Sequence, residues 1–156
     1  MLLQIFAVEK NEELEIIKDL FVEYADSLGF DLSFQDFAQE LANLDEHYAP
    51  PDNCLLLAQV EGQAIGCVAM KQFSQSICEM KRLYVKPKFR GLGIGKALAE
   101  AIIEQARKIS YIRMRLDTVP SMEAARSLYA TLGFQEIYPY TYNPIEGAVF
   151  MELKLS

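Results

Sequence analysis

The spacing of apolar residues changes along the chain between the short period of strands and the longer period of helices, and these changes predict the elements. In the first third of the chain the predicted elements are a strand at Leu2–Val8, a helix at 11–28, a shorter helix at 33–41 and a loop at Asp45–Asn53. Asn11 can cap the first helix and Gly29 can end it. Pro50 and Pro51 prevent the loop from continuing as a helix.

Strands dominate the pattern in the rest of the chain. The predicted strands are Cys54–Val60, Ala64–Phe73, Ile77–Val85, Tyr111–Leu116, Phe134–Tyr138 and Ala148–Leu155, and the predicted helices are 93–109 and 121–132. Only Glu61, Gly62 and Gln63 separate the first two of these strands, as in a hairpin. Ser121 can cap the last helix and Gly133 can end it.

This order of elements predicts an α+β fold in one domain that spans residues 1–156. Because helices lie between strands, we expect a central mixed, mostly antiparallel sheet with helices on both faces. The strand 77–85, the helix 93–109 and the strand 111–116 form a crossover unit, whose two strands should pair in parallel. A chain of 156 residues is long enough for one well-packed core and too short for two ordinary domains.

Charge is distributed unevenly along the chain. The formal net charge of −7 argues against nucleic acid as the main partner, because phosphate binding needs a basic face. Residues 1–70 carry fourteen acids and two bases, whereas residues 71–96 carry seven bases and one acid. Such a basic block indicates either a local anion site or a solvated basic face. No apolar run approaches the roughly 20 residues of a membrane span, so no membrane partner is expected.

The cysteines and the N-terminus bear on the compartment. Cys54, Cys67 and Cys78 lie far apart among apolar neighbours, and the chain has a single histidine, His47. This set predicts reduced core thiols and no metal site. The N-terminal apolar run has no basic residues before it, which is unlike a signal peptide. The expected location is therefore cytoplasmic.

The segment R-G-L-G-I-G-K, from Arg90 to Lys96, joins a predicted strand to a predicted helix. Alternate glycines let the backbone approach a ligand closely, and the free N–H groups at a helix start favour an anion. The P-loop pattern fails because Arg90 replaces its first glycine and Ala97 replaces its hydroxyl residue. The dinucleotide pattern G-x-G-x-x-G fails because Lys96 replaces its last glycine. The pattern that fits is R-x-x-G-x-G.

Glu79–Leu98, which reads EMKRLYVKPKFRGLGIGKAL, resembles motif A of the GNAT family of N-acetyltransferases. Ala124–Phe134 is similar to motif B of that family, and Leu116–Thr118 and Tyr138–Leu153 extend the resemblance over about half of the chain. The resemblance implies a GNAT-like acyl-CoA acyltransferase fold and acetyl-CoA as co-substrate. It also implies direct transfer of the acetyl group to a primary amine of a small molecule or peptide, without a metal.

The resemblance assigns the coenzyme to particular residues. Those expected to bind it are Leu83, Tyr84, Val85, Arg90, Gly91, Leu92, Gly93, Ile94, Gly95, Lys96 and Tyr129. The amides of residues 90–96 would hold the pyrophosphate, and the strand around Leu83 would follow the pantetheine arm and polarise the thioester carbonyl. Met122 and Ala125 stand where the family often has an asparagine, which is a departure from its pattern.

Two residues are implied as catalytic. Tyr129 occupies the motif-B tyrosine position and would protonate the leaving thiolate; simple packing between helix and sheet is the alternative. Glu79 stands where several subfamilies carry a general base; an ion pair with Lys81 or Arg82 is the alternative. A covalent route through Cys78 is disfavoured, because a neighbouring carboxylate opposes a thiolate.

No motif identifies the acceptor amine. His47, Tyr48, Tyr140 and Tyr142 lie on predicted loops that should border its pocket, although surface aromatics need no such role. We expect the basic block to surround the coenzyme and the N-terminal acids to flank the acceptor side, which favours a cationic amine. Acids that only solvate helix faces are the alternative. The sequence does not determine the oligomeric state, and a homodimer is suggested by the habit of the family alone.

Two other classes of protein stay open. A non-catalytic acyl-CoA-binding module could share this fold, but the presence of both Glu79 and Tyr129 argues against it. A nucleotide enzyme could use the glycine loop for phosphate, but no metal-binding carboxylate follows that loop at a useful spacing. Binding of coenzyme A compared with ATP distinguishes these classes.

Overall fold

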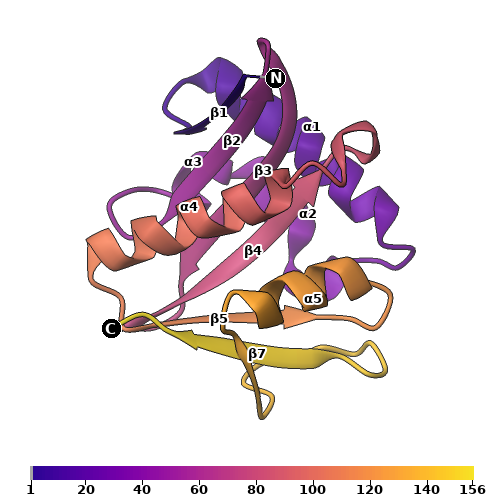
Figure 1. Ribbon diagram of the computed structural model, residues 1–156, viewed down its shortest axis with the longest axis vertical. Coiled ribbons are helices and arrows are strands. Elements are labelled where there is room, and N and C mark those ends of the chain that lie inside the picture. Colours follow the sequence, from indigo (N-terminus) through magenta and orange to yellow (C-terminus); the bar gives the residue numbers. More distant parts are fainter. Residues whose placement is uncertain (1) are drawn as a thin grey trace.

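The computed structural model of the protein describes residues 2–156, which form a seven-stranded sheet with helices on both faces (Figure 1). The strands are β1 (Leu3–Ala7), β2 (Cys54–Val60), β3 (Gln63–Gln72), β4 (Ile77–Val85), β5 (Arg113–Thr118), β6 (Gln135–Ile137) and β7 (Val149–Lys154). The helices are α1 (Asn11–Ser27), α2 (Phe37–Ala42), α3 (Leu44–His47), α4 (Ile94–Ile109) and α5 (Glu123–Thr131), with 3-10 turns η1 (Ser33–Gln35) and η2 (Pro87–Phe89). The expected α+β class is confirmed.

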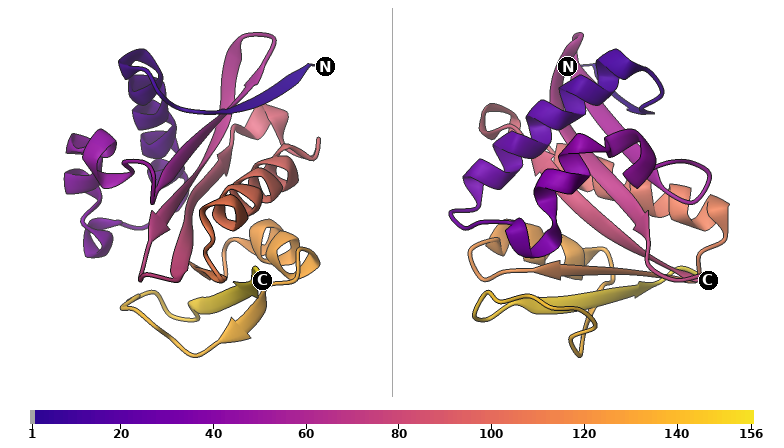
Figure 2. Two further views of the ribbon diagram at one scale, coloured as in Figure 1. Left: turned by 90° about the vertical axis from the view of Figure 1, so that its left-hand side faces the viewer. Right: turned by 180° about the vertical axis from the view of Figure 1, so that it is seen from behind.

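The strands follow the order β1-β2-β3-β4-β5-β7-β6, and every neighbouring pair is antiparallel except β4 and β5. The parallel pairing expected for the crossover unit is therefore confirmed. It is short: Ile77–Glu79 pairs with Arg113–Arg115, and no later residue of either strand pairs across this boundary. Beyond it the sheet splits into two diverging halves, β1–β4 and β5–β7 (Figures 1 and 2).

Two cores hold the helices against the sheet. The larger core lies under α4 and α5, where Leu98, Ile102 and Ala106 repeat at a spacing of four residues and bury one face of α4. The smaller core lies on the opposite face, where Phe21 of α1 packs with Leu57 of β2 (Figure 2). One face of the sheet is thus covered by α4 and α5, and the opposite face is covered by α1.

Some predicted details are wrong. Asn11 is the first residue of α1 and not its cap; instead the Glu13 carboxylate accepts hydrogen bonds from the backbone N–H groups of Glu9 (3.0 Å) and Lys10 (3.1 Å). The second predicted helix is interrupted at Asp36, whose φ of 54° is left-handed. The loop predicted at Asp45–Asn53 is helical at its start, because its first three residues belong to α3. Pro50 and Pro51, which cannot continue a helix, come only after α3 has ended.

A β-bulge interrupts β4 just after it leaves β5. Between the paired positions Lys81 and Tyr84, two residues of β4, Arg82 and Leu83, face the single residue Val68 of β3. Arg82 has a left-handed φ of 61°. The extra residue of a bulge is left unpaired in the ladder, so the backbone here can interact with another group.

Candidate active site

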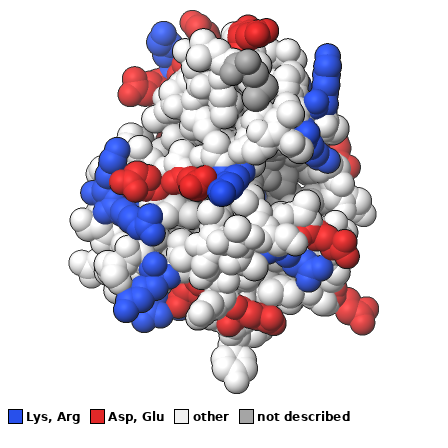
Figure 3. Space-filling model, viewed as in Figure 1, with Lys and Arg blue, Asp and Glu red and all other residues white. Residues whose placement is uncertain are grey.

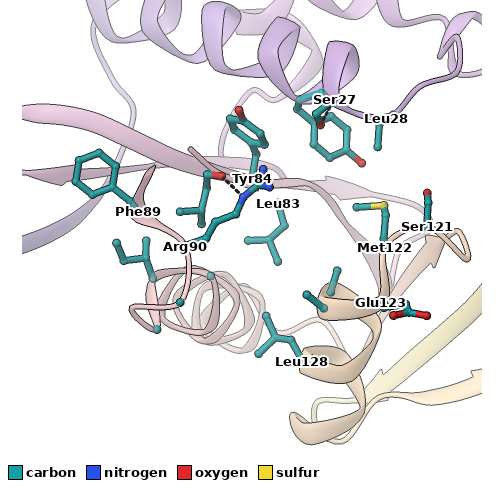
Figure 4. Close-up of a pocket in the computed structure, with 18 residues that line it drawn as sticks. Ser27, Leu28, Leu83, Tyr84, Phe89, Arg90, Ser121, Met122, Glu123 and Leu128 are labelled. Carbon is teal, nitrogen blue, oxygen red and sulfur yellow. Dashed lines mark hydrogen bonds between the residues drawn. The ribbon is translucent and has the colours of Figure 1, made fainter. Parts of the chain in front are cut away.

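A cavity of about 430 Å³ opens where β4 leaves β5, between the end of α1, the β4–α4 connection and the start of α5. Figure 4 shows the wall of this cavity. The wall includes Leu28, which directly follows α1, Leu83 and Tyr84 of β4, and Leu128 of α5. Small-molecule sites range from about 300 to 1,000 Å³. We call this cavity the coenzyme cleft, because most of the residues that the sequence predicts to bind the coenzyme line it.

The glycine loop forms one end of the coenzyme cleft. Gly91 and Gly93 have left-handed φ values of 79° and 81°, which favour glycine, and a Cβ built on either would meet nothing within 4 Å. The loop backbone therefore faces open space at the point where α4 begins at Ile94. The first N–H groups of a helix lack partners within it and favour an anion. The glycine loop and the start of α4 therefore form a candidate anion site at this end of the cleft.

Arg90 is held along the edge of the same cleft. Its Nε donates a hydrogen bond to the carbonyl oxygen of Val85 at 2.9 Å, drawn in Figure 4. Its guanidinium lies 5.7 Å from the centre of the Tyr84 ring. The Tyr84 hydroxyl in turn donates to Glu23 at 3.1 Å. Arg90 thus adds a fixed positive charge at the mouth of the cleft.

Most of the predicted coenzyme residues line the coenzyme cleft: Leu83, Tyr84, Val85, Arg90, Gly91, Gly93, Ile94 and Gly95. Leu92 and Lys96 are not among the lining residues, and Leu92 is 54% exposed. Tyr129 does not line this cleft either. Met122 and Ala125, the two departures from the family pattern, both do.

A second, smaller cavity of about 40 Å³ adjoins the coenzyme cleft, and we call it the acceptor cavity. The two share the lining residues Tyr24, Leu28, Leu83 and Met122. The other walls of the acceptor cavity come from residues 30–35, β4, the end of β5, Tyr129 and Asn143. The two cavities therefore meet at the bulge of β4.

Tyr129 is both a packing residue and a lining residue. Its ring is 6% exposed and lies 5.7 Å from the ring of Phe134, centre to centre. It also lines the acceptor cavity. Burial, with smaller contributions from Tyr24 and Asp117, raises the pKa of Tyr129 well above its ordinary value. The hydroxyl therefore keeps its proton at neutral pH, as a proton donor requires.

Glu79 lies where β4 and β5 are still paired, opposite Arg115. Its carboxylate accepts a hydrogen bond from the Tyr140 hydroxyl at 2.9 Å, and it lines neither cavity. The alternative ion pair with Lys81 or Arg82 does not form among residues 2–156. A proton transfer between Glu79 and an amine in the acceptor cavity would thus need an intervening water.

Arg82 instead forms a buried ion pair with Glu40 of α2. Its Nε and Nη2 donate to the two carboxylate oxygens at 3.0 and 2.8 Å, and Nη1 donates to Gln35 at 2.7 Å. The Tyr48 hydroxyl also donates to Glu40, at 2.9 Å. Burial alone would raise the pKa of Glu40, but the bonds and charge of Arg82 lower it overall. This network ties the bulge residue Arg82 to Glu40 of α2 and to Gln35 of η1.

The expected loop aromatics do not form the acceptor cavity. Tyr48 is buried in the Glu40 network, and the ring of His47 packs edge-on against it at 4.7 Å. Tyr140 is held by Glu79. Tyr142 is largely exposed and contacts the cavity only through Phe34, at a ring distance of 6.4 Å. The hydroxyl groups of Tyr48 and Tyr140 are bonded to carboxylates and Tyr142 is largely exposed, so none of the four lines the acceptor cavity, and their contact with the acceptor stays a prediction.

The charges also lie differently from the expectation. Of the basic block, Arg90 lines the coenzyme cleft, but Lys81 and Arg82 line the acceptor cavity. Within residues 2–70 no acid lines either cavity. Acids and bases are interspersed over the face shown in Figure 3. The acidic approach to the acceptor side is therefore absent from the walls of these cavities.

Several residues of the acceptor cavity were not assigned a role from the sequence. Tyr24, Asp117 and Thr118 line it, and Lys81 was considered only as a partner of Glu79. A local signal existed only for Asp117 and Thr118, within the segment that resembles the family. Tyr24 belongs to the helical pattern of α1 and could not be distinguished from core residues.

The thiols offer no nucleophile. All three cysteines are free, and Cys78 is fully buried. Burial raises the pKa of Cys78 to about 12, so the thiolate is strongly disfavoured. Among the described residues no group of three or more His, Cys, Asp or Glu side chains could hold a metal ion. No helix in residues 2–156 has both the length and the apolar character needed to span a bilayer.

The fold and the cleft are those of an acyl-CoA-dependent acyltransferase, and comparison with known proteins agrees. The sequence profile of the Acetyltransferase (GNAT) family matches residues 14–134. An uncharacterised N-acetyltransferase of Schizosaccharomyces pombe is 42% identical over 156 residues, which cover 99% of this chain and 96% of the relative. The chain belongs to the GNAT family of acetyltransferases, and it is an enzyme that depends on acetyl-CoA.

Other relatives and solved structures extend this similarity. The human N-acetylaspartate synthetase is 33% identical over 100 residues, which cover 63% of this chain and 33% of that enzyme. An acyl-CoA N-acyltransferase from Klebsiella pneumoniae superposes with a TM-score of 0.74 and 27% identity, covering 99% of both chains. An acetyltransferase from Salmonella typhimurium, solved with acetyl-CoA, shares the fold with a TM-score of 0.76 and 19% identity over 99% of this chain and 94% of its own.

Proposed function

We propose that the protein transfers an acetyl group from acetyl-CoA directly to a primary amine of a small molecule or peptide. The observation that carries this proposal is the meeting of the coenzyme cleft and the acceptor cavity at Leu83, beside the bulge of β4. A thioester reaching Leu83 from the cleft would lie next to an amine in the acceptor cavity. The two reactants would be held together without a covalent enzyme intermediate.

The backbone and Tyr129 would perform complementary parts of this transfer. An unpaired amide of the bulge at Leu83 would donate to the thioester oxygen as negative charge develops on it. The amine nitrogen forms the new bond to the carbonyl carbon as the carbon–sulfur bond breaks. Tyr129 would give its proton to the departing sulfur, because burial keeps that hydroxyl protonated and Tyr129 lines the cavity that adjoins the coenzyme cleft.

Glu79 stays the predicted general base. Its carboxylate is fixed by Tyr140, and it stands on the same strand as the bulge, four residues before Leu83. Because it lines neither cavity, we propose that it removes the amine proton through a water. The amine must lose a proton before or during its attack, so some group at this site has to accept one.

The acceptor is proposed here as a primary amine without a required positive charge. The expected preference for a cationic amine rested on acids flanking the acceptor side, and no acid of residues 2–70 lines the two cavities. N-acetylaspartate, the product that names several relatives, is an amino acid acetylated on its amine. An amine acceptor for this chain is consistent with those names.

Release of coenzyme A thiol from acetyl-CoA, measured with a panel of amines, amino acids, polyamines and lysine peptides, tests the proposal. We expect thiol release that depends on an amine, together with the N-acetylated product by mass spectrometry. Binding of coenzyme A without transfer to any amine would indicate the alternative, a non-catalytic acyl-CoA-binding module. A covalent acetyl-enzyme trapped in the absence of amine would contradict direct transfer.

A further inference from the structure

The acceptor cavity contains polar groups for which residues 2–156 provide no side-chain partner. Thr118 is 3% exposed, and its Oγ1 is buried without a hydrogen-bond partner among the described residues. A buried hydroxyl that loses its bonds to water and gains none in return destabilises the fold by roughly 1–3 kcal/mol. Because Thr118 lines the cavity at the end of β5, a bound molecule could satisfy this hydroxyl.

Lys81 is the second such group. It lines the same cavity, and it forms no ion pair or hydrogen bond with another side chain in residues 2–156. The adjacent guanidinium of Arg82 is already occupied by Glu40 and Gln35. Burial first, and the charge of Arg82 second, lower the pKa of Lys81, while the charges of Glu79, Glu40 and Asp117 act in the opposite direction. An anionic group in the cavity would give this ammonium a direct partner.

Asp117 provides the opposite charge in the lining of the same cavity. One of its oxygens accepts a hydrogen bond from the amide of Asn143 at 3.0 Å, which leaves the other available. Asp117 and Lys81 do not form an ion pair with each other. The acceptor cavity therefore presents one separate positive and one separate negative group, with an unpaired hydroxyl nearby.

We infer that the acceptor is a small amine that also carries a carboxylate, an amino acid in the simplest case, and that Lys81 and Thr118 bind this carboxylate. Asp117 would hold the ammonium form of the same molecule before it is deprotonated. The cavity of about 40 Å³ has room for a carboxylate-sized group. This inference rests on the proposed function and specifies the acceptor of that site.

Matched pairs of acceptors test the inference in the unmodified enzyme. We would compare kcat/KM for alanine with alaninamide and ethylamine, and for phenylalanine with phenylalaninamide. The amides keep the amine and the side chain but lack the negative charge. We expect the amino acids to be preferred by at least about tenfold, the effect of one hydrogen bond to a charged group.

Substitutions then assign the preference to residues. Lys81→Met should lower kcat/KM for alanine by about 10- to 100-fold and leave that for alaninamide nearly unchanged. Thr118→Val, which keeps the shape of the side chain, should lower kcat/KM for alanine several-fold. Lys108→Met is the matched control, because Lys108 is an exposed lysine in the last turn of α4 and lines neither cavity. Unchanged coenzyme A binding checks that each variant is folded.

The outcomes separate the inference from the proposed function. Transfer to amines with equal or better use of the amides would overturn the inference and leave the proposed function intact. The same holds if Lys81→Met lowers kcat/KM equally for alanine and alaninamide, because that result indicates a structural role. Transfer to no amine at all would overturn both. A preference in the unmodified enzyme that Lys81→Met abolishes would support the inference.

Discussion

The coenzyme cleft and the acceptor cavity touch each other but are built in different ways. Half of the residues that line the coenzyme cleft come from one continuous segment, residues 83–95, whose glycines shape the backbone itself. The acceptor cavity is assembled from side chains of α1, residues 30–35, β4, β5, α5 and the segment before β7. The contrast suggests that backbone recognition serves a constant ligand, whereas side chains from distant segments select the variable one.

The difference also appears in what stabilises each region. At the coenzyme cleft, the shape of the glycine loop rests on positive φ angles and on the start of α4. Both features depend on a few neighbouring residues. At the acceptor cavity, the bulge of β4 is clamped by the buried pair of Arg82 with Glu40, from a helix more than forty residues earlier in the chain. Damage to the first region should therefore affect binding, and damage to the second should affect stability and catalysis.

The largest expected effect is at the glycine loop. Gly93→Val should abolish measurable binding of coenzyme A, because a branched side chain would fill the open space beside the loop and strain its left-handed backbone. Isothermal titration with coenzyme A measures this. Gly62→Val is the matched control: Gly62 has the same φ of 81° and the same open surroundings, but lies in the β2–β3 turn. Normal binding by Gly93→Val would place the anion site elsewhere.

Tyr129→Phe should lower kcat by about 10²- to 10⁴-fold, the usual contribution of a general acid, while the Kd for coenzyme A stays nearly unchanged. The ring that packs against Phe134 is retained, so the free energy of unfolding should change little. Tyr138→Phe serves as the control, since Tyr138 is 92% exposed. An unaltered kcat with a good amine would reduce Tyr129 to a packing residue.

Glu79→Gln should lower kcat at neutral pH, by about 10²-fold for a general base that acts through a water. Raising the pH should restore part of the rate, because more of the amine then arrives without its extra proton. A pH profile of kcat for both proteins measures this. Tyr140→Phe, which removes only the hydrogen bond to Glu79, is expected to have a smaller effect in the same direction. A uniform loss at every pH would contradict the assignment.

Glu40→Gln should lower the free energy of unfolding by about 3 kcal/mol, because it leaves the buried Arg82 without its counter-charge. The pKa of Glu40 is lowered in the folded protein, so its contribution is present above the ordinary value of 4.5 and is lost as pH falls through the lowered pKa. Urea unfolding at pH 7 and below pH 4.5 should show this loss in the wild type and not in Glu40→Gln.

A less buried carboxylate provides the comparison for Glu40. Glu152 pairs with Arg113 and Arg115 on partly exposed strands, and its removal should lower the free energy of unfolding by no more than about 1 kcal/mol. An equal loss for Glu40→Gln and Glu152→Gln would show that the pair beneath the bulge is not specially important.

The smallest expected effect is at Arg90. Arg90→Ala should weaken coenzyme A binding by about tenfold, because one charged partner is lost while the backbone amides of the loop are retained. The exposed position of Arg90 at the mouth of the cleft makes this loss dependent on salt. Titrations at low and high ionic strength measure both quantities. A loss as large as that of Gly93→Val would mean that side-chain charge, and not the loop backbone, dominates binding.

The amino-acid sequence alone determined those features that depend on neighbouring residues. The bounds of β2 and β4 were predicted as they are found, because alternating apolar runs between turn residues specify strands locally. The glycine loop and the start of α4 were likewise evident, since positive φ angles need glycine within the same short segment.

The tertiary structure alone decided how distant segments pair. The chain contains many carboxylates, and only the packing of separate elements selects Glu40 of α2 as the partner of Arg82. Lys81, the residue before Arg82, has no ion-pair partner within residues 2–156. The bulge, the position of Glu79 outside both cavities and the polar walls of the acceptor cavity have the same origin. Their physical basis is the contact of side chains from separate elements, which no local pattern of residues encodes.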